Sequence, residues 1–328
     1  MIARRKLLIA LGAGALAAPL ARIAQGQKVY RIGYLANDPD RSSPTFQAFA
    51  GAMRQLGWTE GANLEIRYYS SGGRDELFVG IAAQTVRENV DLIVTTGSAS
   101  TRAAIGATGR IPIVFGSAAN PVEQKFVASL ARPGGNVTGL ALLVQELGPK
   151  RMQLLKGILP RAKRFARLYQ AKSIAAIQPA IIRVDNEAAR ELGVLLEHIP
   201  IAGLDGVEPA FAAAARGAVD ALHVTAAALF VVNRGWIAKL ALEHRLPVMG
   251  PDSRFTEAGA LASYGENFAA RYRRAASLVD KILRGARPAE LPVEQPELFE
   301  LVLNLETAKA LNVTIPDPIL LQANRVIG

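Results

Sequence analysis

The sequence predicts an α/β protein built from two doubly wound, Rossmann-like lobes. Short apolar strand patterns alternate with amphipathic helix patterns from residue 28 onwards. The chain has 328 residues, about twice the length of one ordinary domain. Strands that are apolar throughout and separated by helices predict parallel sheets covered on both faces. Two successive units of this kind account for the length.

The first half predicts five strands and four helices. Phe46, Phe49, Met53 and Leu56 recur at helical spacing, and the fully apolar strand patterns are typical of buried parallel strands. Ser98 is positioned to cap the helix that it begins. The expected strands are 29–35, 64–68, 91–95, 111–115 and 136–140, and the expected helices are 44–56, 77–88, 98–107 and 123–130.

The second half repeats the alternation. Its expected strands are 164–169, 194–199, 221–225, 246–249, 260–264 and 298–304, and its expected helices are 145–159, 174–192, 207–216, 229–244, 269–283 and 306–312. Arg132–Gly135 reads as a turn, and the chain is expected to cross between lobes near Leu143–Pro149 and again at the Pro-rich segment Arg287–Pro296. The predicted division is 27–142 plus about 270–296 for the N-terminal lobe, and 143–269 plus about 297–328 for the C-terminal lobe.

Composition excludes several classes of protein. The chain has no cysteine, which excludes disulfides, thiolate zinc sites, iron–sulfur clusters and cysteine nucleophiles. Its three histidines are spread along the chain, so no metal site is expected. The net charge is +10, but the first 26 residues carry four basic and no acidic residues, which leaves +6 for the rest. Without an aromatic-interleaved basic stripe, we expect a basic soluble surface and no nucleic-acid partner.

Residues 1–26 are predicted to be a signal peptide. A basic start at Arg4, Arg5 and Lys6 precedes an apolar run that is too short to span a bilayer comfortably. The paired arginines favour twin-arginine export, with an ordinary Sec signal as the alternative. Since there is no cysteine to carry a lipid anchor, we expect a free periplasmic protein.

The residues that follow the strands are the predicted site, because ligands bind outside the carboxyl ends of the strands in such sheets. Thr96, Gly97 and Ser98 follow the third strand and open a helix, whose free N–H groups attract an anion such as a carboxylate. The loop after the fourth strand repeats this arrangement with small residues and a helix start. Its candidate residues are Gly116, Ser117, Ala118 and Asn120.

Further candidates follow the other strands. Asn37 and Asp38 come after the first strand, Gln170 and Thr225 end strands of the second half, and Phe230 can stack on a ligand or pack in the core. Asp252 is a candidate partner for a ligand amine and equally a candidate helix cap.

Motifs of catalysis are missing. The chain contains no G-x-S-x-G, P-loop or H-E-x-x-H motif, so neither an enzyme nor a cofactor is expected. His223 lies inside an apolar strand and is predicted to be a satisfied core residue. The predicted cleft is poor in charge, with Asp252 its only acidic candidate and Arg254 the only arginine beside a strand end.

The chain resembles the substrate-binding protein family of ABC transporters, in particular the tryptophan-type binding proteins with the type I periplasmic binding fold. The resemblance covers nearly the whole chain after residue 30. It is weakest over Gln170–Ala202, where the family usually has Asn-Pro after the strand and this chain has Gln170-Ala171. The segments that carry it include RIGYL (31–35), DLIVTTGSASTRAA (91–104), IPIVFGSAANPV (111–122), VASLARPGGNVTGL (127–140) and LPVMGPDSRFTEAGALASYGENF (246–268).

This resemblance implies a hinged, two-lobed monomer that closes on an amino acid or similar organic acid and delivers it to an ABC permease in the inner membrane. The loops at Thr96–Ser98 and Ser117–Asn120 would then hold the ligand carboxylate, and Thr225–Phe230 with Asp252 its amine and side chain. A periplasmic sensor that presents its bound state to a membrane receptor remains the alternative. A DNA-binding repressor would need a helix-turn-helix where the signal peptide lies, and an enzyme stays open because a fold alone never excludes chemistry.

Overall fold

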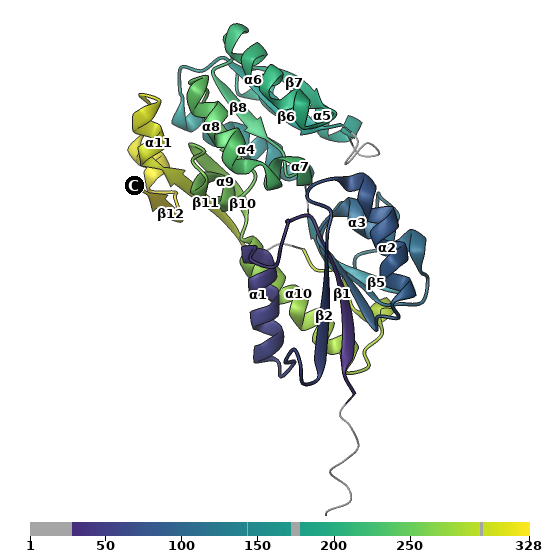
Figure 1. Ribbon diagram of the computed structural model, residues 1–328. Coiled ribbons are helices and arrows are strands. Elements are labelled where there is room, and N and C mark those ends of the chain that lie inside the picture. The colour runs from purple at the N-terminus through teal and green to yellow at the C-terminus, as the bar shows by residue number, and fades with distance from the viewer. Residues whose placement is uncertain (1–27, 143, 172–177, 296–297) are drawn as a thin grey trace, which may run out of the picture.

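The computed structural model describes residues 28–142, 144–171, 178–295 and 298–328. Figure 1 shows two α/β lobes, each formed by a sheet with helices on both faces. The predicted fold class is therefore confirmed. The signal peptide predicted at residues 1–26 lies outside the described residues. Within the described ranges, no helix combines the length and apolar character needed to cross a membrane.

The first sheet is parallel and has the order β2-β1-β3-β4-β5. Its two faces carry separate apolar cores, one beneath helices α1 and α10 and the other beneath α2 and α3. The elements of this lobe are β1 Tyr30–Ala36, α1 Pro44–Gln55, β2 Leu64–Ser70, α2 Phe78–Arg87, β3 Leu92–Thr95, α3 Ser98–Ala107, β4 Ile113–Ala119, β5 Val137–Leu142 and α10 Phe268–Leu283.

The second sheet has the order β12-β11-β10-β9-β8-β6-β7 and is parallel except for the β10–β11 pair. One core lies beneath α4, α5, α11 and α12, and the other beneath α6, α7, α8 and α9. The elements are α4 Val144–Ile158, β6 Arg164–Gln170, α5 Gln178–Glu191, β7 Leu195–Ile201, α6 Val207–Arg216, β8 Ala221–Val224, α7 Ala228–Val232, α8 Arg234–Glu243, β9 Val248–Gly250, α9 Ser253–Glu257, β10 Ala262–Glu266, β11 Phe299–Asn304, α11 Leu305–Ala310, α12 Asp317–Leu320 and β12 Arg325–Ile327.

Two helix predictions are wrong. Residues 123–130 form turns, because Lys125 adopts a left-handed conformation (φ 59°) that a right-handed helix cannot contain. The helix expected over 229–244 is broken at Asn233 into α7 and α8. The Asn233 side chain donates to the Leu229 carbonyl at 2.8 Å and competes there with its own backbone N–H, which lies 3.4 Å from the same oxygen.

The chain passes between the lobes more than once. Of the crossover expected near Leu143–Pro149, residue 143 lies outside the described residues and the rest belongs to α4. Helix α10 follows β10 of the second sheet but packs on α1 of the first lobe. Beyond α10, Glu294 pairs with Leu140 of β5, so this segment also runs along the first lobe before β11 returns to the second sheet.

Arg271 of α10 is buried where these passages meet. Its guanidinium donates to the carbonyls of Gly116 (2.6 Å) in the middle of β4 and of Ala141 (2.8 Å) and Leu140 near the carboxyl end of β5. It also forms an ion pair with Glu266, the last residue of β10. Burial lowers the pKa of Arg271 to about 10, which still leaves it charged at pH 7.

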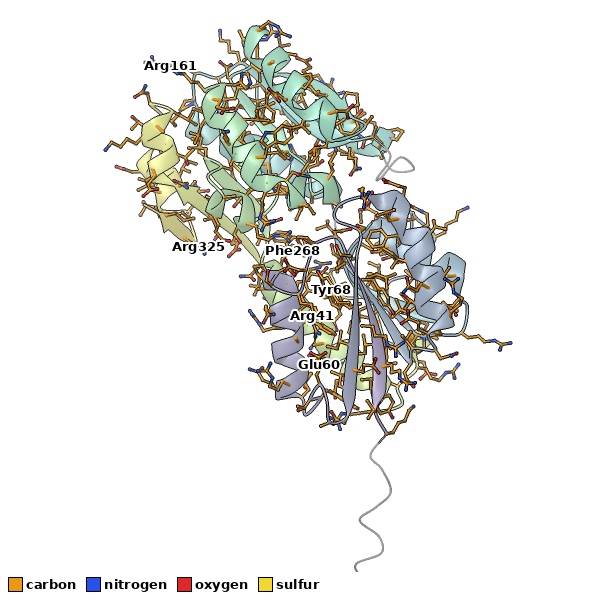
Figure 2. All side chains as sticks on the ribbon, viewed as in Figure 1. Arg41, Glu60, Tyr68, Arg161, Phe268 and Arg325 are labelled. Carbon is orange, nitrogen blue, oxygen red and sulfur yellow. The ribbon has the colours of Figure 1, made fainter. Side chains whose placement is uncertain are left out.

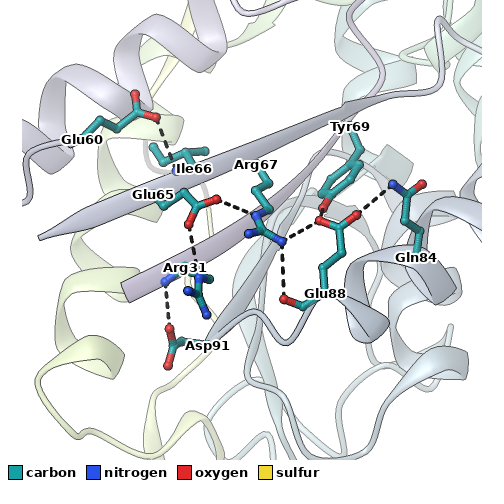
Figure 3. A network of polar contacts seen from close by, with 9 residues as sticks. All are labelled: Arg31, Glu60, Glu65, Ile66, Arg67, Tyr69, Gln84, Glu88 and Asp91. Atoms are coloured by element: carbon teal, nitrogen blue, oxygen red, sulfur yellow. Dashed lines mark hydrogen bonds and ion pairs between the residues drawn. The ribbon is translucent and has the colours of Figure 1, made fainter. Parts of the chain in front are cut away.

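A network of partly exposed charged side chains links β1 and β2 to the C-terminal end of α2 (Figure 3). Arg67 lies between Glu65 and Glu88. Its Nε is 2.7 Å from Glu65 Oε1, and its Nη1 is 2.7 Å from Glu88 Oε2. Arg31 Nε lies 3.2 Å from Glu65 Oε2. Tyr69 donates to Glu88 from the same side. Because these groups are substantially exposed, solvent screens them and their contribution to stability is small.

We expect Arg271→Met to destabilise the protein by about 3–5 kcal/mol, because it leaves a buried carboxylate and three carbonyls without their donor. Urea unfolding measures the change. Arg273→Met, on the exposed face of the same helix, is the control and should change stability by less than about 0.5 kcal/mol. Equal small effects for both variants would contradict a structural role for the Arg271 contacts.

Candidate functional site

A cavity lies between the lobes, at the carboxyl ends of strands from both sheets. Its empty space, including the part open to solvent, is about 1180 Å³. Eight of the thirteen predicted site residues line it. They are Asn37, Asp38, Thr96, Gly97, Ser98, Ser117, Gln170 and Thr225.

The first-lobe wall of the cavity is built from three loops that are tied to one another. The backbone N–H of Asn37 donates to Thr96 Oγ1 at 3.1 Å, which joins the loops after β1 and β3. Ser98 Oγ accepts from the Ala119 backbone N–H at 3.0 Å, which joins the loops after β3 and β4. These bonds hold polar groups from separate strands on one surface.

The N-terminus of α3 opens onto this wall. Gly97 is its cap, so the prediction that Ser98 caps the helix is wrong: Ser98 is the first helical residue, and its hydroxyl serves the neighbouring loop. Ser100 Oγ accepts from the Gly97 N–H at 3.1 Å. The first-turn N–H groups, including those of Ser98 and Ala99 at the cavity, have no carbonyl partner within the helix. With the helix dipole, they favour an anion here.

The fourth strand is longer than predicted: β4 runs to Ala119, so Gly116, Ser117 and Ala118 belong to the strand and not to the loop after it. Of the four candidates predicted here, Ser117 lines the cavity and the other three do not. Gly116 faces Tyr272, since a Cβ at this position would lie 2.5 Å from Tyr272 Cε1. Ala118 is buried in the core beneath α2 and α3. Asn120 is buried with φ 39°, and its N–H donates to the Leu142 carbonyl at 3.1 Å. Gly116, Ala118 and Asn120 therefore pack behind the residues that line the cavity.

Two predicted residues of the second lobe also lie outside the lining. Phe230 is fully buried in the core, so packing rather than ligand stacking accounts for it. Asp252 caps α9 and holds Arg254 through two hydrogen bonds, at 2.8 Å to Nε and 3.0 Å to Nη2. Of its two predicted roles, the structure therefore supports the cap.

Arg254 and two aromatic rings line the cavity where the lobes meet. The guanidinium of Arg254 lies over the ring of Phe268, 4.6 Å from its centroid, at the start of α10. Figure 2 shows Phe268 at the junction between the lobes. Tyr272, one turn further along α10, donates to the Thr96 carbonyl at 3.4 Å. These contacts place an apolar and cationic surface between the two polar walls.

The prediction of a cleft poor in charge is wrong. The second-lobe wall contains Arg151 of α4, Arg167 of β6 and Asp185 of α5, all buried. These residues lie inside their elements rather than after strands, so a search of strand ends misses them. One signal was available: Arg167 stands in a strand buried on both faces, where a charge needs a partner.

The buried charges are paired. Arg167 Nε lies 3.1 Å from Asp185 Oδ2. Burial lowers the pKa of Arg167 and raises the pKa of Asp185 to about 6, because loss of hydration outweighs the attraction of the arginines. Arg151 donates to the carbonyls of Tyr264 (2.7 Å) and Pro251 (3.0 Å).

His223 belongs to the same wall. Its Nε2 lies 3.4 Å from Arg151 Nη1, and because a guanidinium only donates, Nε2 is the acceptor and Nδ1 carries the proton. Burial, and then the charge of Arg151, holds the pKa of His223 well below its usual value. The histidine is buried as predicted, but it lines the cavity and its Nδ1 has no partner among the described residues, so it is not a satisfied core residue.

Residues 39–327 match the family of ABC transporter substrate binding proteins. The chain belongs to this family. A tyrosine-binding protein of Clostridioides difficile (strain R20291) is 27% identical over 289 residues, which cover 88% of this binding protein and 81% of that relative.

Two solved structures have similar folds. A conserved domain protein from Vibrio cholerae has a TM-score of 0.82 at 28% identity, with 92% of this binding protein and 99% of that chain covered. The ABC domain of Streptococcus pneumonia in complex with L-Trp also has a TM-score of 0.82, at 21% identity over 92% and 100% of the chains. In the described part of the binding protein, no group of three or more acidic or histidine side chains is arranged to hold a metal ion.

The raised pKa of Asp185 predicts that the free energy of unfolding depends on pH. Below about pH 4 its carboxyl is protonated in both the folded and the unfolded chain, and between about pH 4 and 6 only the unfolded chain releases the proton. The folded state is therefore disfavoured as pH rises, by up to about 3 kcal/mol above pH 6. Asp185→Asn removes this term.

Urea unfolding at pH 4, 5, 6 and 7 tests this expectation. The stability of the binding protein relative to its Asp185→Asn variant should fall across this range, while other titrating groups cancel in the difference. A difference that is constant with pH would contradict a raised pKa for Asp185.

Proposed function

We propose that this substrate-binding protein is the periplasmic component of an ABC importer, which binds a small carboxylate-bearing ligand between its lobes and delivers it to a membrane permease. The ligand is an amino acid or a related organic or aromatic acid. The observation that carries this proposal is the N-terminus of α3, which presents free N–H groups to a cavity lined by both lobes.

The two walls support a binding rather than a catalytic role. Each lobe presents half of the site, so a ligand that contacts both walls favours the closed arrangement of the lobes. A few residues at the crossovers would absorb the rotation. We propose that the protein acts as a monomer, without a cofactor, after export directed by residues 1–26.

The relatives agree with this ligand class. One related protein is named for tyrosine, and a protein of the same fold holds L-Trp. Both ligands carry a carboxylate, which the N-terminus of α3 would accept here, and both carry an ammonium group, for which the cavity offers carboxylates such as Asp38.

A ligand screen tests the proposal. The purified protein is unfolded and refolded to remove bound ligand, and its thermal stability is measured with amino acids, aromatic acids and dicarboxylates. A ligand at 100 times its Kd should add about 2.7 kcal/mol of stability. Stabilisation by one class of carboxylates and not by their methyl esters is expected, and stabilisation by none of them would contradict the proposal. Uptake of the identified ligand by the reconstituted permease would then separate transport from sensing.

Ala99→Asp should abolish carboxylate binding without weakening the fold. An acidic side chain in the first turn of α3 is favourable to the helix dipole, but it places a negative charge where the ligand carboxylate would lie. We expect an affinity at least about 100-fold lower, from calorimetry, corresponding to about 3 kcal/mol. Ala99→Asn is the neutral control of the same shape. Equal affinities of the two variants would place the carboxylate elsewhere.

A further inference from the structure

The cavity extends into the second lobe, between its sheet and helices α4 and α5. Gly148 of α4, Arg167 and Gln170 of β6, Asp185 of α5 and His223 of β8 line this part, which we call the second-lobe subsite. Arg167 and His223 are register partners on adjacent strands, so their side chains leave the same face of the sheet. Asp185 approaches that face from α5, where it meets Arg167.

Polar atoms without hydrogen-bond partners gather in this subsite. They are Arg167 Nη1, Gln170 Oε1, His223 Nδ1 and Asp185 Oδ1, each buried and without a hydrogen-bond partner among the described residues, whereas Asp185 Oδ2 is held by the ion pair with Arg167 Nε. Arg167, Asp185 and His223 are at most 2% exposed. Since buried polar groups in folded proteins are nearly always hydrogen-bonded, this concentration on one cavity wall indicates a place for a polar group of a ligand.

The unpaired atoms define the chemistry of that group. Arg167 Nη1 and the protonated Nδ1 of His223 are donors, whereas Gln170 Oε1 and Asp185 Oδ1 are acceptors. The charges of Arg167 and Asp185 compensate each other. Arg151 adds a further positive charge to this wall, but its donors are engaged by the carbonyls of Tyr264 and Pro251 and by His223 Nε2. A second carboxylate would be repelled by Asp185, and an ammonium group would be repelled by Arg167. A neutral group that both donates and accepts satisfies both sets of atoms.

We propose that the second-lobe subsite receives the end of the ligand remote from its carboxylate, and that this end carries a hydroxyl or carboxamide group. The proposal rests on the proposed function, in which α3 of the first lobe holds the carboxylate. It narrows the ligand class to carboxylates with a neutral hydrogen-bonding group at the far end.

The expected discrimination is large. A ligand with a hydrocarbon end would leave these buried donors and acceptors unpaired, whereas a hydroxyl or carboxamide group would pair with them. Sites built to bond a substrate hydroxyl reject the analogue without it by factors of about 10⁴–10⁵. We expect a preference of at least about 100-fold for the polar member of a matched ligand pair.

Matched ligand pairs test the proposal on the unmodified protein. Calorimetry compares tyrosine with phenylalanine, 4-hydroxybenzoate with benzoate, and glutamine with norvaline and glutamate. The proposal expects one polar, neutral member to bind at least about 100-fold more tightly than its partner. Equal affinities within every pair that binds, or tighter binding of the hydrocarbon or doubly charged member, would overturn the proposal and leave the proposed function intact. Failure of all these carboxylates to bind would also overturn the proposal, and the wider ligand screen described above would then decide the proposed function.

Gly148→Ala tests the location of the subsite. A Cβ at Gly148 would lie 2.0 Å from Asp185 Oδ1, so the variant must displace this carboxylate. The preference for the polar ligand should fall at least about tenfold, while binding of the hydrocarbon member changes little. Gly235→Ala in α8, where nothing lies within 4 Å of the new Cβ, is the control. A folded Gly148→Ala variant with full preference would overturn the assignment, and the ligand pairs decide the proposal if that variant does not fold.

Discussion

Arg271 connects the crossovers on which the two-lobed arrangement depends. Its guanidinium holds the middle of β4 and the carboxyl end of β5 in the first lobe and meets Glu266 at the end of β10 in the second. The chain leaves the first sheet directly after β5 and leaves the second directly after β10. One buried cation therefore fixes two of the connections between lobes, and it also fixes the backs of the loops that line the cavity. Three carbonyls and the Glu266 carboxylate all depend on this one guanidinium, so β4, β5 and the end of β10 must keep fixed positions around it.

The cavity between the lobes is polar on both walls, but for different physical reasons. In the first lobe the polarity comes from backbone N–H groups at the start of α3, from short hydroxyl side chains and from the acidic side chains of Asp38 and Asp75. In the second lobe it comes from ionised side chains buried beneath the sheet, where loss of hydration raises the pKa of Asp185 and lowers that of Arg167. The first wall suits a charged end of a ligand, and the second suits a neutral end that can bridge a donor and an acceptor.

Local sequence signals predicted the first-lobe wall well. The loops after β1, β3 and β4 are short and follow apolar strands, so Asn37, Thr96 and Ser98 could be placed at the cavity from the chain order alone. The same reasoning left two roles open for Asp252, because a carboxylate after a strand satisfies a helix cap and a neighbouring arginine as readily as a ligand, and the structure shows the cap. It failed at 123–130, where Lys125 takes up a conformation that no pattern of apolar residues reveals.

The sequence by itself determined the alternation of strands and helices, and with it two parallel-sheet lobes, because hydrophobic periodicity is a local property of the chain. It also determined that a helix begins directly after β3, and the first-turn N–H groups of any helix have no carbonyl partner within that helix. Only the tertiary structure decided that Arg151, Arg167, Asp185 and His223 meet on one wall. These residues come from two helices and two strands, and their meeting depends on how α4 and α5 pack against the sheet. Packing between segments that are distant in the sequence brings these charges together, so the spacing of the residues along the chain does not predict their contact.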